Sequence, residues 1–143
     1  MLRTYSRIIA LNAMVAAVSM TTRAADETLT LTCQGTEISK WGATDQPTTL
    51  ELMPFGVIVN LTARTVEGFP VSNLPVKVTA ANQAAIEFEG SETSALNRRF
   101  SGTIDRVTGE AWATFTMETN AAAATSRAIA TFSLKCRPAQ RMF

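Results

Sequence analysis

Glu87 and Glu89 are the two side chains in this sequence whose spacing comes closest to a catalytic apparatus. Residues two apart on a β-strand share a face, and a pair of carboxylates is the minimum that hydrolysis of a glycosidic bond requires. The neighbouring sequence supplies no apolar pocket that would let one of the two act as an acid, so we expect both to face solvent. A carboxylate-based hydrolase is therefore the third of the three functions that we consider.

Arg98 and Arg99 are adjacent, and two guanidinium groups aimed into one cleft could clamp an anion. Neighbouring side chains at the start of a strand point to opposite faces, so solvated charge is the simpler interpretation. We keep both arginines as possible partner contacts.

The two tryptophans, Trp41 and Trp112, are the aromatic side chains best suited to contact a ligand. Trp41 lies in a polar stretch, where an exposed indole is costly unless it binds a partner or folds back. Trp112 lies on a strand face opposite Ala111 and Ala113, where packing in the core or in a second layer is the simpler interpretation than ligand stacking. Trp41 therefore joins Arg98 and Arg99 as a possible partner contact.

Several classes of chemistry are missing from the chain. It contains no histidine, which excludes Ser-His-Asp and Cys-His catalysis, histidine metal ligands and a histidine pH switch. No Gly-rich phosphate loop, Asp-rich calcium loop or Ser-x-x-Lys motif is present. From Ala25 onward, ten Lys and Arg stand against twelve Asp and Glu, so this part carries about two net negative charges. We expect no cofactor, no metal and no nucleic-acid partner.

The first 25 residues have the three parts of a secretory signal peptide. Arg3 and Arg7 precede an apolar run over residues 8–18, and small and polar residues follow as far as Ala25. The apolar run is too short to cross a bilayer as an ordinary helix, so we expect removal and no stable membrane insertion afterwards. We expect cleavage after Ala24, with Ala25 as the alternative. The expected organisation is a signal peptide over residues 1–24 and a single β domain over residues 25–143, in a periplasmic or secreted protein.

Two cysteines, Cys33 and Cys136, remain in the exported part of the chain. An isolated pair in an oxidising compartment is most simply a disulfide, and two buried free thiols are the alternative.

Alternation of apolar and polar residues predicts a series of short strands. Cys33 and Cys136 fall on the apolar faces of the first and last of these strands, which suggests that the ends of the chain meet. The clearest turn runs from Asp105 to Gly109, where an Asp can accept backbone hydrogen bonds and a Gly can adopt a left-handed conformation. The predicted strands cover residues 28–33, 49–53, 55–66, 76–79, 85–89, 100–104, 111–117 and 128–136.

Three further segments do not alternate clearly. We predict a surface loop over residues 35–48 and a polar loop over residues 90–99, while Pro54 is expected to break the strand before it. Residues 118–125, with four alanines, fit one helical turn or an ordered crossover. Eight or nine short strands without a long helix predict an all-β fold, a small antiparallel meander closed as a barrel or packed as a sandwich.

The layout resembles small exported proteobacterial proteins of unknown function. The resemblance rests on Cys33-Gln34-Gly35-Thr36 in the first strand, the Ile-Asp-Arg-x-Thr-Gly hairpin that begins at Ile104, and Cys136 near the end. It implies export and the disulfide, but no activity. The chain is also similar, less closely, to the periplasmic inhibitors of C-type lysozyme, small β-barrels that carry a cysteine in their first strand.

These observations favour a non-enzymatic exported domain that binds an unknown protein or small ligand through its loops or the mouth of its barrel. The main alternative is an inhibitor of a secreted hydrolase such as lysozyme. That inhibitor would use Trp41 or the predicted loop over residues 90–99.

Overall fold

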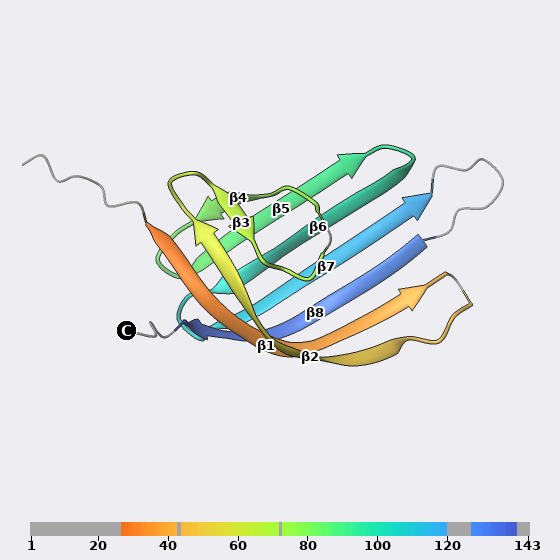
Figure 1. Cartoon of the computed structure of the whole chain (residues 1–143), viewed down its shortest axis with the longest axis horizontal. Coiled ribbons are helices and arrows are strands. Elements are labelled where there is room, and N and C mark those ends of the chain that lie inside the picture. The colour runs from red at the N-terminus through yellow and green to blue at the C-terminus, as the bar shows by residue number, and fades with distance from the viewer. Residues whose placement is uncertain (1–26, 43, 72, 120–126, 140–143) are drawn as a thin grey trace, which may run out of the picture.

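The chain forms a closed barrel of eight antiparallel strands that follow one another in sequence order (Figure 1). The computed structural model describes residues 27–42, 44–71, 73–119 and 127–139. The strands are β1 (Thr28–Trp41), β2 (Thr48–Asn60), β3 (Thr65–Glu67), β4 (Val76–Ala81), β5 (Ala85–Thr93), β6 (Leu96–Asp105), β7 (Glu110–Thr119) and β8 (Arg127–Pro138). The strand order confirms the predicted all-β meander and shows that it closes as a barrel and not as a sandwich.

The predicted signal peptide lies outside the described residues, and so does most of the alanine-rich segment between β7 and β8. Within the described ranges, no helix is long and apolar enough to cross a membrane.

The hairpin of β6 and β7 forms as predicted, and the side chain of Asp105 organises its turn. The N–H groups of Val107 and Thr108 each donate to Asp105 Oδ1 over 2.8 Å. Both bonds favour the ionised carboxylate and so hold the pKa of the Asp105 carboxyl below its usual value, and the bond from Thr108 has the larger effect. Gly109 closes the turn with a φ of 73°. Its carbonyl accepts a hydrogen bond from the N–H of Cys136, so the turn is fastened to β8.

The barrel closes where β1 pairs with β8 along eleven registered positions, from Leu31 opposite Pro138 to Trp41 opposite Ala128. Cys33 and Cys136 lie directly opposite each other in this ladder and form a disulfide. The predicted pairing is therefore confirmed, and it covalently joins the first strand to the last. A disulfide of this kind is typical of proteins that fold in an oxidising, extracytoplasmic compartment.

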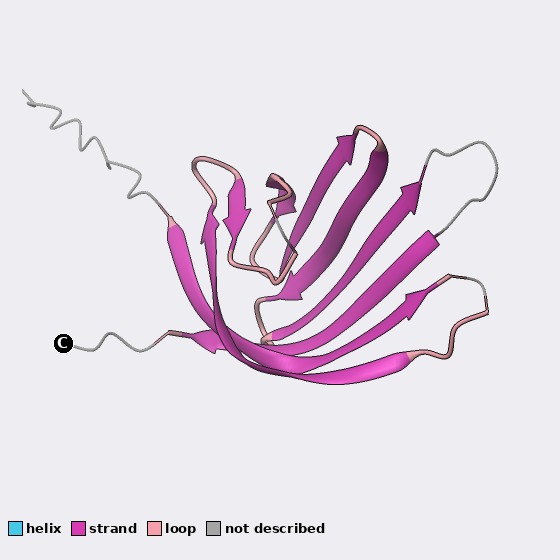
Figure 2. Cartoon of the chain, turned by 45° about the vertical axis from the view of Figure 1, so that its right-hand side comes forward, coloured by secondary structure: helices cyan, strands magenta, loops and turns pink. Residues whose placement is uncertain are grey.

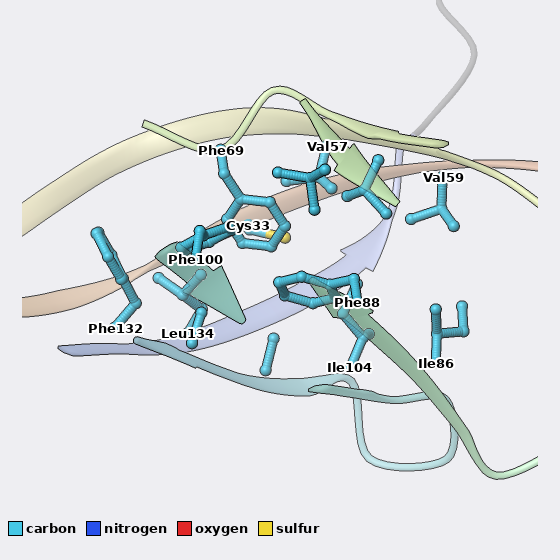
Figure 3. Close-up of a cluster of buried hydrophobic side chains, with 14 of the residues drawn as sticks. Cys33, Val57, Val59, Phe69, Ile86, Phe88, Phe100, Ile104, Phe132 and Leu134 are labelled. Atoms are coloured by element: carbon cyan, nitrogen blue, oxygen red, sulfur yellow. The ribbon is translucent and has the colours of Figure 1, made fainter. Parts of the chain in front are cut away.

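Phenylalanine rings fill the interior beside the disulfide (Figure 3). Phe69, from the loop between β3 and β4, lies inside the barrel with its ring centroid 5.0 Å from that of Phe88 and 5.1 Å from that of Phe100. Phe132 meets Phe100 edge to face at 6.0 Å. Because side chains occupy this half of the barrel, it is a packed core.

Much of two predicted loops is in fact strand, although residues 42 and 44–47 form a loop as predicted. The segment predicted as a surface loop over residues 35–48 begins with the continuation of β1, which runs to Trp41. The segment predicted as a polar loop over residues 90–99 holds the end of β5 and the start of β6, paired from Gly90 opposite Phe100 to Thr93 opposite Asn97. Both predictions were wrong because the ladders continue past the core, where neither face has to be apolar.

Pro54 does not end a strand either. β2 runs through it, and the register with β1 shifts between Cys33 and Gly35. Cys33 pairs with Phe55 and Gly35 with Leu52, so β2 carries an additional residue at this point. A bulge accommodates a proline, which has no N–H to donate to the ladder.

The barrel is complete at one end only, because β3 and β4 are much shorter than the other strands. β2 pairs with β3 through Ile58–Asn60 alone, and β5 pairs with β4 only as far as Glu89. Beyond these positions the other six strands continue as a curved sheet that has lost its opposite wall (Figure 2). We call this the open end.

Candidate binding site at the open end of the barrel

The inner face of the six long strands continues past the core into the open end. Cross-strand partners share a face of a sheet, so the register identifies which side chains belong to this surface. We call it the trough, and it comprises Glu37, Ser39, Trp41, Thr48, Leu50, Leu52, Glu92, Leu96, Arg98, Phe115, Met117, Thr119, Ala128 and Ala130.

One row of the trough brings together two of the three predicted contact residues. Trp41 is paired with Ala128, Ala128 with Met117, and Met117 with Arg98, so the four side chains cross β1, β8, β7 and β6 on the inner face. Glu92 of β5 completes the row opposite Arg98. Trp41 and Arg98 therefore flank the same short stretch of β8 and β7, although 57 positions separate them in the sequence.

Ala128, which is 7% exposed, lies between the larger side chains of Trp41 and Met117 in this row. These three side chains line a pocket of about 340 Å³, together with Gly42, Asp45, Thr119 and Arg127. Trp41 is 60% exposed, and Leu50 on the neighbouring strand is 56% exposed. Both side chains face inward and remain exposed because the wall formed by β3 and β4 does not extend over them.

The charges of the trough are partly paired. Arg98 donates through Nε to Glu92 Oε2 over 2.9 Å, and its Nη2 contacts the same oxygen. Arg99 points to the outer face, where its Nε lies 3.2 Å from Glu89 Oε1. The adjacent arginines thus diverge, as expected for neighbours on a strand, and do not form a joint anion clamp.

Backbone groups form the sides of the trough. Residues 48–57 of β2 have no strand partner, among the described residues, on the side away from β1. Residues 90–93 of β5 likewise have none on the side away from β6. Gly68 lies against Gly56 and Pro75 lies against Gly90, so the edges that an extended segment could join are residues 48–55 of β2 and 91–93 of β5.

The other chemistry-bearing residues lie on the outer surface. Glu87 and Glu89 face solvent as expected, and on the outside of β5 they line an open hollow of about 310 Å³ together with Ser101 and Thr103. Trp112 also faces outward and is 50% exposed, which corrects the expectation that it packs in a core or a second layer. No group of three or more His, Cys, Asp or Glu side chains that could hold a metal occurs in the part of the chain that the structure describes.

Sequence reasoning missed most of the trough, although one signal for it was available. Trp41 lies eight positions after Cys33, so an uninterrupted strand puts both on the same face. Leu50, Met117 and Ala128 give no comparable signal, because their meeting depends on the order of the strands.

Comparison of the chain with protein-family models, with curated proteins and with solved structures finds no match. The two resemblances noted in the sequence stay predictions.

Proposed function

We propose that this protein is an exported, non-enzymatic binding module that holds an extended segment of a partner protein in the trough. The observation that carries the proposal is the inward-facing row Trp41, Ala128, Met117 and Arg98, of which the first three side chains line a pocket of about 340 Å³. The disulfide supports a periplasmic or secreted location.

The missing wall favours a protein partner over a small molecule. A pocket for a small ligand buries most of the ligand's surface, whereas the trough is open opposite its floor, where β3 and β4 do not reach. A protein segment brings its own surface to cover Trp41 and Leu50, which are both more than half exposed. Its backbone can also pair with the unpartnered edge of β2.

The absence of a catalytic step is supported by the residues available. The sequence has no histidine, and both cysteines are in the disulfide. Glu87 and Glu89 lie on the outer face, away from the trough. Turnover of an envelope substrate by the purified protein, abolished in the double variant E87Q/E89Q, would instead establish the hydrolase hypothesis.

Photo-crosslinking within the exporting cell tests the proposal. A benzophenone amino acid replaces Leu50, which faces the trough, and in a matched control it replaces Met53, which is 83% exposed on the same strand. We expect one protein partner to be crosslinked from position 50 and not from position 53. Ala128→Leu, which fills the space between Trp41 and Met117, should reduce that crosslink several-fold. Equal labelling from both positions would refute a partner in the trough.

Inhibition of a secreted hydrolase such as lysozyme is a second candidate. It is favoured by the hairpin tips after Trp41 and after Thr93, which both lie at the open end and could enter a cleft in an enzyme. This candidate predicts inhibition at sub-micromolar protein, and loss of inhibition in Trp41→Ala. A C-type lysozyme whose rate is unchanged by the protein would remove that enzyme as the target.

A further inference from the structure

The outer face of the sheet carries a second surface suited to a ligand, and Trp112 of β7 lies at its centre. Half of this indole is exposed, although the adjacent inward positions Ala111 and Ala113 are buried in the core. An exposed tryptophan on a regular strand gains nothing from core packing. Whether it can bind a ligand depends on the side chains around it.

The strand register places hydroxyl side chains on both sides of this indole. Trp112 pairs with Ser133 of β8 on one side and with Thr103 of β6 on the other. Ser133 pairs with Thr36 of β1, and the same row ends at Glu51 of β2 and Glu87 of β5. We call this row of six side chains the outer band.

Neighbouring strands lie about 4.8 Å apart, so a row that crosses six strands extends over about 24 Å. Because the sheet closes into a barrel, this length follows the curved outside of the barrel, and a straight glycan segment contacts the part of the row centred on the indole.

Hollows accompany the outer band along its length. One of about 600 Å³ lies beside Trp112 and is also lined by Gln34, Glu110 and Lys135. A second, of about 340 Å³, shares Trp112, Thr36 and Ser133 with the first. A third, of about 310 Å³, lies beyond Thr103 and reaches Glu87. The surface around the indole is therefore indented on both sides.

These groups have the chemistry that recognises a carbohydrate. The face of an indole carries the negative part of its quadrupole and attracts the polarised C–H groups of a flat sugar ring. Hydroxyl side chains such as Thr36, Ser133 and Thr103 both donate and accept hydrogen bonds, as sugar hydroxyls do, and the Gln34 amide can do so as well.

The charges select the kind of glycan. No charged side chain lies between Glu51 and Glu87 in the outer band. Beside it, Lys135 is 3.4 Å from Glu110 and so is locally neutralised. Carboxylates at both ends repel an anionic polymer. A protein partner fits less well, because Trp112 and Ile38 are the only large apolar side chains that line the two hollows beside the indole and are exposed.

We propose that the outer band binds a neutral glycan, with one pyranose ring stacked on Trp112 and the neighbouring rings beside Ser133 and Thr103. The proposal is independent of the trough, because Trp112 and Trp41 lie on opposite faces of the same sheet. A binding module of this kind would hold a glycan on its outside and a protein segment on its inside.

Nuclear magnetic resonance titration of the oxidised protein tests the proposal, with cellohexaose and chitohexaose as neutral probes and hexagalacturonate as the anionic control. The two indole N–H signals are assigned with Trp41→Phe and Trp112→Phe. At least one neutral probe should shift the Trp112 signal and the amide signals of Thr36, Ser133 and Thr103, with a dissociation constant on the order of 0.1–1 mM. The Trp41 signal should stay in place.

Trp112→Ala should weaken this binding at least about tenfold, while Trp41→Ala leaves it unchanged. Since Trp112 is half exposed, both variants should keep the amide spectrum of the fold, and Trp112→Phe provides a milder replacement that retains a stacking ring. No saturable shift with either neutral probe at millimolar concentration overturns the proposal, as do shifts confined to Trp41. Equal binding of hexagalacturonate overturns the selection for a neutral glycan.

Discussion

Reduction of the Cys33–Cys136 disulfide should lower the free energy of unfolding by about 4.7 kcal/mol. The two cysteines are 103 positions apart, so the bond removes the entropy of a loop that spans most of the described chain. In the chain-entropy model, a loop of this length costs about 16 cal/mol/K, which gives that energy at 25 °C. The midpoint of thermal unfolding should fall by about 15–20 °C.

Urea unfolding of the oxidised and the reduced protein, followed by circular dichroism, measures this difference. The native barrel should survive reduction, because β1 and β8 stay paired at eleven registered positions. The reduced protein should show a steeper dependence on urea, since its unfolded chain exposes more surface. The variant C33A/C136A should behave like the reduced protein with an additional small loss of packing.

A matched control separates the covalent tie from the packing of the same region. Leu134→Ala removes buried side-chain volume beside Cys136 without opening any loop, so it should lower stability while leaving the urea dependence of the oxidised protein unchanged. A difference below about 1 kcal/mol between oxidised and reduced protein would refute the entropic account. It would show that the unfolded chain retains enough structure without the bond to offset the loss of loop entropy.

Three further predictions concern the interior and the turns. Phe69→Ala should cost about 3–5 kcal/mol in urea unfolding, because the ring packs against the rings of Phe55, Phe88 and Phe100. Gly68→Ala should destabilise the fold, since a Cβ there overlaps the carbonyl oxygen of Gly56 and φ is +97°, whereas Gly56→Ala, whose Cβ meets nothing, should be tolerated. The ionised Asp105 carboxylate should stabilise the native state above about pH 4, and this contribution should disappear as the pH falls through its lowered pKa. Asp105→Asn should therefore differ from the wild type in thermal midpoint at neutral pH and converge with it in acid.

The features that the sequence predicted correctly are those that depend on the closed half of the barrel. Phe55, Val57 and Val59 alternate with exposed residues because the interior covers one face of β2. Asp105 and Gly109 define their turn through local hydrogen bonds and a local backbone conformation. The cysteine pairing followed from composition and from the inward faces of two strands.

The choice of the barrel over the sandwich and the shared pocket of Trp41 and Met117 were beyond the sequence, although the cysteine pair had suggested that the ends of the chain meet. Both depend on β1 lying beside β8, a contact between segments about a hundred positions apart. Local periodicity gives the faces of a strand but not its neighbours, so barrel and sandwich stayed equally compatible with the pattern. The prediction that Trp112 lies on the strand face opposite Ala111 and Ala113 was correct, but the prediction that it packs in a core or a second layer was wrong, because nothing among the described residues covers half of the indole.

The two wrong loop predictions have one physical cause, and it bears on function. A strand is recognised when one of its faces is apolar, which requires an opposite wall to exclude water from that face. From Gly35 onward the inner face of β1 reads Gly35, Glu37, Ser39 and Trp41, a mixture that no closed core would accept. Glu92 of β5 and Arg98 of β6 likewise place charged side chains on the inner face of their strands. The alternation therefore fails where the wall formed by β3 and β4 stops, and those positions line the trough. Departures from a consistent pattern concentrate at sites that serve something other than folding, so the places where the sequence misled us independently favour the trough as the binding surface.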